Sequence, residues 1–80
     1  MSARLAILPT QEPAKPHLSP REVEVVRLVS ASYTTAEIAA ALGISGRTVE
    51  TYRQGIRWKT GASTRVQVAL YAVREGLVKI

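Results

Sequence analysis

Cysteine and aspartate are absent from the 80 residues of this chain, and histidine occurs once, as His17. Without thiols, neither disulfides nor thiolate metal sites can reinforce the fold. A single histidine does not make a zinc site. The same absences remove the His, Cys and Asp combinations on which many catalytic sites are built, and no glycine-rich phosphate loop replaces them. We therefore expect neither an enzyme nor a protein that holds a cofactor or a metal ion.

Long hydrophobic runs are also missing. The apolar run Leu5 to Leu8 has four residues, which is too short for the core of a signal peptide. No stretch approaches the roughly 20 apolar residues that cross a bilayer. A chain of this length makes one small domain with a thin core. The sequence predicts no membrane association and a cytoplasmic location at the nucleoid.

Positive charge is plentiful and unevenly placed. The net charge is +5 and the isoelectric point is about 10.3, which favours a polyanionic partner. Residues 18–43 carry two arginines against three glutamates, a net charge of −1. Residues 44–65 carry five basic residues against Glu50 alone, a net charge of +4. The partner is therefore expected at the second of these segments.

Proline separates an arm from a folded domain. Three of the four prolines lie in residues 1–17, where they prevent a continuous helix and favour an extended, flexible arm. Leu5, Ile7 and Leu8 can dock on the domain or on a partner, but a frayed arm is the simpler interpretation. We expect the domain to cover residues 18–80.

Local signals divide that domain into four helices. Ser19-Pro20-Arg21-Glu22 and Thr34-Thr35-Ala36-Glu37 are capping boxes, the first with a favoured proline. Gly43, Gly61 and Gly76 mark helix ends. The predicted helices cover about 19–31, 35–42, 46–60 and 64–75. The expected fold class is all-α, a four-helix bundle with a central helix-turn-helix and an irregular N-terminal arm.

The segment Thr34 to Lys59 is the helix-turn-helix. A small-residue helix, a turn containing Gly43 and a basic second helix form the pattern of a unit that reads double-stranded DNA. At 100° per residue, Val49 and Ile56 of the second helix face the core. The opposite side then carries Arg47, Thr51, Gln54 and Trp58.

Several polar residues of this unit are candidate DNA contacts. Arg47 and Arg57 can pair with phosphates, and Gln54 can read adenine. Thr34 or Thr35 can present a hydroxyl and a helix N-terminus to a phosphate. Glu50 can accept from cytosine or bond Arg53 or Arg57, and we favour that structural role.

Gly55 and Trp58 leave alternatives open. Glycine inside a helix costs about 1 kcal/mol relative to alanine. Either the helix frays or bends at Gly55, or another group approaches it closely. Trp58 either packs on the domain or faces DNA, and packing is favoured because tryptophan normally buries most of its ring.

The last predicted helix carries an apolar stripe at i, i+3, i+4 and i+7 spacing, formed by Val66, Ala69, Leu70 and Val73. Core packing and dimerisation compete for it, and we favour a homodimer at least on DNA. Such a dimer would place two recognition helices about 34 Å apart on an inverted repeat.

The order of these motifs is similar to one family. LSPRE at Leu18 to Glu22, EIA at Glu37 to Ala39, LGIS-x-x-TVE at Leu42 to Glu50 and the GL at Gly76 together resemble the LuxR-type (GerE/FixJ/NarL) DNA-binding domain over Leu18 to Val78. The resemblance implies a four-helix bundle whose third helix enters the major groove and whose fourth forms a dimer. It also implies a standalone, GerE-like regulator or an excised fragment, because no receiver or ligand-binding domain accompanies it.

The resemblance assigns residue roles as well. It places Glu50, Thr51 and Gln54 at base edges, and Thr48 and Lys59 at the phosphate backbone. The chain departs from the family pattern at Tyr52, where histidine is common, and at Trp58, where a basic residue is common. Arg53, Arg57 and Thr60 also replace residues that are usually more apolar.

A different class of function remains open. A short family member can instead bind protein, acting as a co-regulator or inhibitor of RNA polymerase or of a larger regulator. The fourth helix or the N-terminal arm would then be the contact. Selection of bound DNA sequences discriminates between the two, because only a sequence-specific regulator enriches an inverted repeat.

Overall fold

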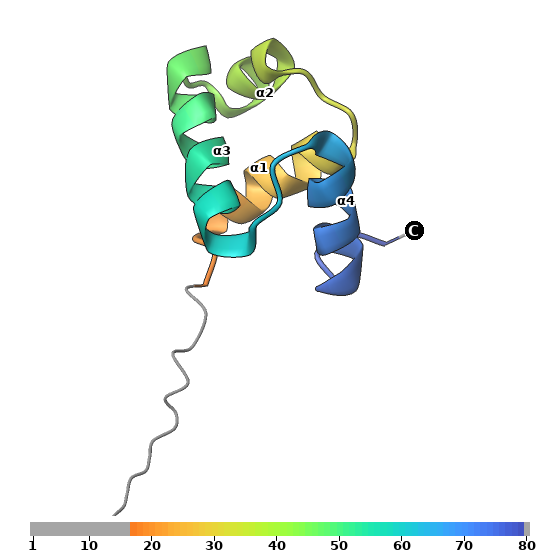
Figure 1. Ribbon diagram of the computed structural model, residues 1–80. Helices are drawn as coiled ribbons and strands as arrows, with labels where there is room; N and C mark the ends of the chain where they lie inside the picture. Colours follow the sequence, from red (N-terminus) through yellow and green to blue (C-terminus); the bar gives the residue numbers. More distant parts are fainter. Residues whose placement is uncertain (1–16, 80) are drawn as a thin grey trace, which may run out of the picture.

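The computed structural model describes residues 17–79, so the predicted arm lies outside the described residues except for His17. Within that range the chain forms four helices and no strand: α1 (Pro20–Ser30), α2 (Thr35–Leu42), α3 (Gly46–Thr60) and α4 (Arg65–Arg74). The predicted all-α fold is confirmed, and every helix boundary lies within one residue of its expectation. In Figure 1, α1 runs between α3 and α4, and α2 lies beside the first turns of α3.

The predicted caps explain why the helices begin where they do. Both expected capping boxes form: Ser19 and Glu22 exchange hydrogen bonds at the start of α1, and Thr34 and Glu37 do so at the start of α2. Thr64 and Gln67 make a third box at α4. Each box satisfies backbone N–H groups that have no partner inside the helix.

Each of the four helices is followed by a residue in the left-handed conformation, and these residues are Ser32, Gly43, Gly61 and Gly76. Gly43 ends α2 at φ 69°, which is the conformation that glycine adopts without a steric penalty. After α1 the same role falls to Ser32 at φ 71°. The Tyr33 N–H donates to the Leu28 carbonyl at 3.0 Å and the Ser32 N–H to the Val29 carbonyl at 2.9 Å, which is the Schellman pattern. A residue with a side chain thus holds a position that usually belongs to glycine.

The core is small and aliphatic, and α1 lies at its centre. α1 packs against α4, α3 and α2. α1 contributes three buried valines, and each of the other elements contributes one or two residues. The buried set is Val25, Val26, Val29, Ile38, Val49, Ile56, Ala62, Val68 and Ala72. Because α3 and α4 attach to different sides of α1, each keeps one face in solvent (Figure 1).

Candidate nucleic-acid interface

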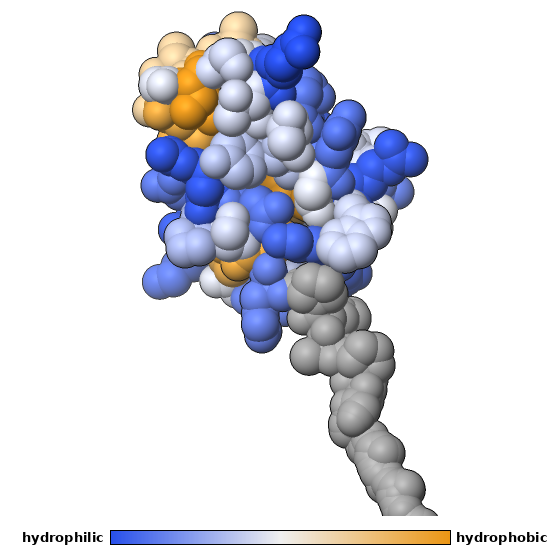
Figure 2. Space-filling model, turned by 90° about the vertical axis from the view of Figure 1, so that its left-hand side faces the viewer, coloured by the Kyte–Doolittle hydropathy of each residue, from blue (hydrophilic) through white to orange (hydrophobic). Residues whose placement is uncertain are grey.

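The outward face of α3 is polar and basic. The four residues predicted on it are all exposed, and they are Arg47, Thr51, Gln54 and Trp58. Arg57, which lies beside this face, is exposed as well. Figure 2 looks at this side of the molecule and shows a largely hydrophilic surface, with the largest apolar area at the height of α2 and smaller apolar areas below it. Val49 and Ile56 on the other side of the helix are 0% and 2% exposed. Burial of those two side chains fixes the rotation of α3 and therefore the direction of its basic face.

No arginine of α3 forms a salt bridge with another described residue. Within residues 17–79 there are two salt bridges, Arg21–Glu24 and Lys59–Glu22, and neither includes an α3 arginine. The expected bond of Glu50 to Arg53 or Arg57 is therefore wrong. Glu50 instead accepts a hydrogen bond from the Thr35 hydroxyl at 3.0 Å, which ties α2 to α3. Its structural role is real, but its partner lies on the other helix.

The threonines of the candidate interface differ in whether the hydroxyl hydrogen is already donated within the protein. The Thr35 hydroxyl donates to Glu50. The Thr34 oxygen accepts from the Glu37 N–H at 3.1 Å, and its own hydrogen remains available to a phosphate. Thr51 donates to the Arg47 carbonyl at 3.2 Å. Of the two expected phosphate contacts at the start of α2, Thr34 and Thr35, the free hydroxyl hydrogen therefore favours Thr34.

Thr48 is held at the start of α3. Its N–H donates to the Ser45 oxygen at 3.0 Å, and the hydroxyls of Ser45 and Thr48 share a hydrogen bond of 2.9 Å. Thr48 is only half-buried. This pair orders the turn that leads into α3.

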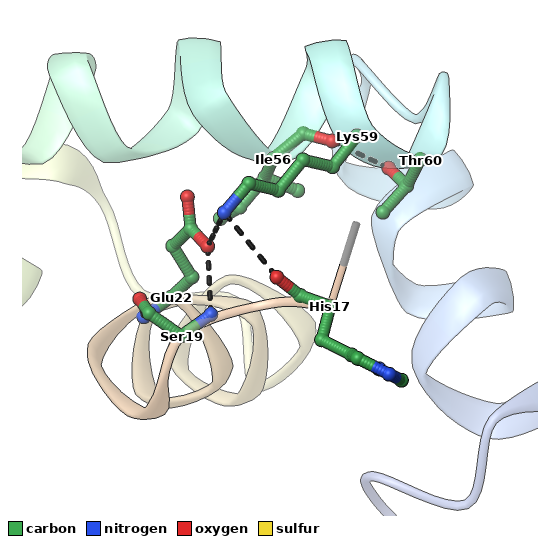
Figure 3. Close-up of polar contacts among 6 residues, drawn as sticks. All are labelled: His17, Ser19, Glu22, Ile56, Lys59 and Thr60. Atoms are coloured by element: carbon green, nitrogen blue, oxygen red, sulfur yellow. Dashed lines mark hydrogen bonds and ion pairs between the residues drawn. The ribbon is translucent and has the colours of Figure 1, made fainter. Parts of the chain in front are cut away.

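Lys59 points into the protein rather than away from it (Figure 3). Its ammonium donates to Glu22 Oε1 at 2.7 Å and to the His17 carbonyl at 3.3 Å. The same carboxylate oxygen accepts from the Ser19 N–H at 2.8 Å. The lysine side chain is 21% exposed and that of Glu22 is 9% exposed. Lys59 therefore joins the end of α3 to the start of α1.

Gly55 provides the space for this ion pair. A Cβ atom at residue 55 would lie 2.7 Å from Glu22 Oε2, closer than non-bonded atoms approach. The carboxylate cannot simply swing away, because Lys59 and Ser19 hold its other oxygen. Of the alternatives left open by the sequence, close approach by another group is the one found. α3 continues through Gly55 to Thr60 as a single helix.

The protonation of Glu22 reflects two opposed effects. Burial raises the pKa of this carboxyl, but the hydrogen bond and charge of Lys59 and the hydrogen bonds from Ser19 together lower the pKa below its ordinary value. Glu22 is therefore ionised at neutral pH. The ion pair contributes stability that is lost as the pH falls through the lowered pKa.

The apolar stripe of α4 is exposed on the other side of the molecule. Val66 is 65% exposed, Leu70 59% and Val73 37%. Together with Ala69 they border a shallow groove of about 280 Å³ that Ser30 and Ser32 close at the end of α1. Core packing of α4 uses a different side, through Val68 and Ala72. The stripe is therefore available to a partner.

The described residues hold no other candidate centre. Between residues 17 and 79, no three His, Cys, Asp or Glu residues lie where they could hold a metal ion. In the same range, no helix has the length and apolarity to cross a membrane.

Comparison with known proteins assigns the fold to a family. Residues 16–72 match the family described as bacterial regulatory proteins, luxR family. The chain belongs to the luxR family. It is 38% identical over 61 residues to the transcriptional regulatory protein MctR of Rhizobium johnstonii. The aligned segment covers 76% of this chain and 28% of MctR. It is 39% identical over 70 residues to the response regulator Rre1 of Synechocystis, covering 88% of this chain and 30% of the relative.

A third relative, the regulatory protein SdiA of Escherichia coli, is 39% identical over 62 residues, which is 78% of this chain and 26% of SdiA. The chain thus spans between a quarter and a third of the length of these luxR-family relatives. The family is one of transcription regulators with a helix-turn-helix DNA-binding domain and not a class of enzymes.

Trp58 is the residue at which expectation and structure differ most within this luxR-family domain. The prediction that it packs on the domain is wrong, because the side chain is 77% exposed. Packing space at the end of α3 is taken by Ile56 on the buried side and by Lys59 against α1. The position of Trp58 on the helix predicted its exposure, since it shares a face with Arg47, Thr51 and Gln54.

Proposed function

We propose that this luxR-family domain binds double-stranded DNA in a sequence-specific manner, with α3 in the major groove. The observation that supports this most directly is the charge on the outer face of α3. Arg47 and Arg57 are exposed there and have no acidic partner within residues 17–79, while the one acid nearby, Glu50, is bound to Thr35. A rigid helix that presents unpaired guanidinium groups is suited to a phosphate-lined groove.

We assign the direct contacts to the side chains that remain free. Gln54 is exposed in the middle of the α3 face and offers an amide that matches adenine. Arg47 and Arg57 flank it and suit phosphates or guanine. Thr51 lies at a base-facing position, and the free hydrogen of Thr34 suits a phosphate.

Three expected contacts take a supporting role in this proposal. Lys59 positions α3 through Glu22, Glu50 positions it through Thr35, and Thr48 orders its first turn with Ser45. Their effect on DNA binding then comes through the placement of α3. Removal of Lys59 would disturb the fold, so Arg57 is the better residue for testing phosphate contact.

Dimerisation through α4 completes the proposal. Val66, Leu70 and Val73 are exposed aliphatic residues on one face, and a second copy of the same face would bury them. The two recognition helices of such a dimer contact half-sites about one turn of DNA apart. Binding of an inverted repeat would then gain affinity from both halves.

Selection of bound sequences from random duplexes tests the proposal. We expect enrichment of an inverted repeat with half-site centres separated by about 10 base pairs. Gln54→Ala should relax the preference at one position by about 1–3 kcal/mol. Arg57→Ala should weaken all sequences alike and make the salt dependence shallower by about one unit. Failure to bind or enrich any duplex, with co-purification of RNA polymerase instead, would favour the co-regulator function.

A further inference from the structure

Trp58 is the only tryptophan of the chain, and 77% of it is exposed. A single exposed aromatic residue on a protein surface is ordinary. What distinguishes this one is its surroundings, because the exposed residues that share its face of α3 are the polar or basic Arg47, Thr51 and Gln54. An indole at such a place adds nothing to the core and must keep its apolar ring in water.

The position of Trp58 on α3 relates it to the proposed DNA contacts. Counted at 100° per residue from Arg47, the side chains of Thr51, Gln54 and Trp58 fall within about 40° of one line along the helix. Trp58 lies eleven residues beyond Arg47, or roughly 16 Å farther along the axis. Since a recognition helix contacts base edges with its N-terminal part, this far end reaches the sugar–phosphate strand that borders the groove.

The ion pair at the end of α3 explains why Trp58 is suited to that strand. Lys59 is held by Glu22 and the His17 carbonyl, so it is not the group that extends toward DNA. The same bonds fix the last turn of α3 on α1 and hold the backbone of Trp58 in place. The exposed side chains left on this turn are Arg57 and Trp58.

The chemistry of the indole matches a deoxyribose. Its flat face is apolar, and its one polar group is the Nε1–H donor. A deoxyribose offers an apolar face of carbon atoms, with phosphate oxygens on either side as acceptors. We propose that Trp58 packs its ring against a deoxyribose at the edge of the major groove and donates Nε1–H to the adjoining phosphate. This inference rests on the proposed function and extends its interface to the last turn of α3.

A neutral contact of this kind has a recognisable effect on affinity. It releases no counterion, so it strengthens binding without changing the salt dependence. It touches no base edge, so it strengthens selected and unrelated duplexes alike. Arg57, one residue away, should show the opposite salt behaviour and is the matched control.

The substitution test measures affinity for the selected duplex and for an unrelated one over a series of salt concentrations. Trp58→Ala should weaken both by on the order of tenfold at every salt concentration. Trp58→Phe keeps a flat ring and lacks the donor, so its affinity should lie between those of the wild-type protein and Trp58→Ala. Arg57→Ala should instead reduce the slope against salt. Because Trp58 is exposed, its variants should melt at the wild-type temperature.

Fluorescence gives an independent readout, because Trp58 is the only tryptophan. In the free wild-type protein iodide should quench its emission readily, and in the DNA complex it should be protected. Wild-type affinity of Trp58→Ala, or equal quenching of free and bound protein, would overturn this inference and leave the proposed function standing. Loss of self-association by Trp58→Ala with unchanged DNA affinity would overturn it too. Absence of DNA binding by the wild-type protein would overturn both.

Discussion

The outer face of α3 and the outer face of α4 are both uncovered, but they differ in chemistry. α3 presents arginines, amide and hydroxyl groups with one indole, whereas α4 presents Val66, Leu70 and Val73. The two helices lie on different sides of α1 (Figure 1). A polar, positively charged face gains little from a second protein copy, and an aliphatic face gains little from DNA. The difference is consistent with the two partners proposed for these faces, DNA for α3 and a second copy of the chain for α4.

The faces also differ in how they are held. α4 is fixed by ordinary core packing of Val68 and Ala72 against α1. The last turns of α3 depend on a polar arrangement in which Lys59 reaches Glu22 over the space left by Gly55. Changes near Glu22 should therefore act on the α3 face and leave the α4 face intact.

The largest expected effect comes from Leu70→Asp. An aspartate in the apolar face of α4 should prevent dimerisation and weaken binding of an inverted repeat about 100-fold, with little change on a duplex that holds one half-site. Fluorescence anisotropy with the two duplexes measures this. Val23→Asp, at a half-buried position of α1 beside Arg21 and Arg27, is the control. A lowered melting temperature would show instead that Leu70 supports the core.

Glu22→Ala should have the next largest effect, a loss of about 2 kcal/mol in the free energy of unfolding. It removes the carboxylate that accepts from the Ser19 N–H and leaves Lys59 without its acidic partner, although partial exposure of the lysine allows some rehydration. Glu24→Ala breaks only the exposed pair with Arg21 and should cost less than about 0.5 kcal/mol. Urea denaturation measures both, and equal losses would contradict the role given to Glu22.

The effect of Gly55→Ala on the free energy of unfolding should change sign with the residue at position 22. In the wild-type protein the added methyl group meets the Glu22 carboxylate, and we expect a loss of about 1 kcal/mol despite the better helix propensity of alanine. In the Glu22→Ala background that obstacle is absent, and the same substitution should stabilise by up to about 1 kcal/mol. A double-mutant cycle measures the coupling. The same sign in both backgrounds would show that Gly55 serves another purpose.

The smallest expected effect is a dependence of the stability on pH, which comes from the Glu22 carboxyl. The folded-state pKa of Glu22 is lowered, so its contribution is complete above the unfolded pKa of about 4.3 and is lost as pH falls through the folded pKa. The wild-type protein should therefore lose more stability than Glu22→Gln between neutral pH and about pH 3. Urea titrations of the two proteins at each pH isolate the effect, since the other carboxyls are common to both. If the unfolding free energies of the two proteins differed by the same amount at every pH, Glu22 would not be the source of the pH dependence.

The sequence predicted the fold closely because helix caps are local. Ser19, Thr34 and Ser45 are recognised within four residues of the backbone groups they satisfy, and Val49 and Ile56 fix the rotation of α3 by periodicity alone. The end of α1 carried no such signal, since Ser32 adopts a conformation that glycine usually takes. It was still placed to within a residue, because the apolar pattern stops there.

The site was predicted less completely because its determining contacts are distant in sequence. Lys59 and Glu22 are 37 residues apart, and Thr35 and Glu50 are 15 apart. When each helix is considered alone, the side chains of these four residues have no visible partner and look like ordinary exposed polar groups. Gly55 indicated that something approached α3 but not what. Trp58 was misjudged because the general preference for burial was given more weight than its place on the helix.

Chemical-shift mapping tests the central claim most directly, that DNA binds to the α3 face and not to the α4 face. The measurement is a titration of the isotopically labelled chain with a duplex that carries a single half-site, so that dimerisation does not contribute. The account predicts the largest amide shifts from residues 46 to 58 and near Thr34, with residues 66 to 73 unchanged. Shifts concentrated at Val66, Leu70 and Val73, with α3 unaffected, would contradict it.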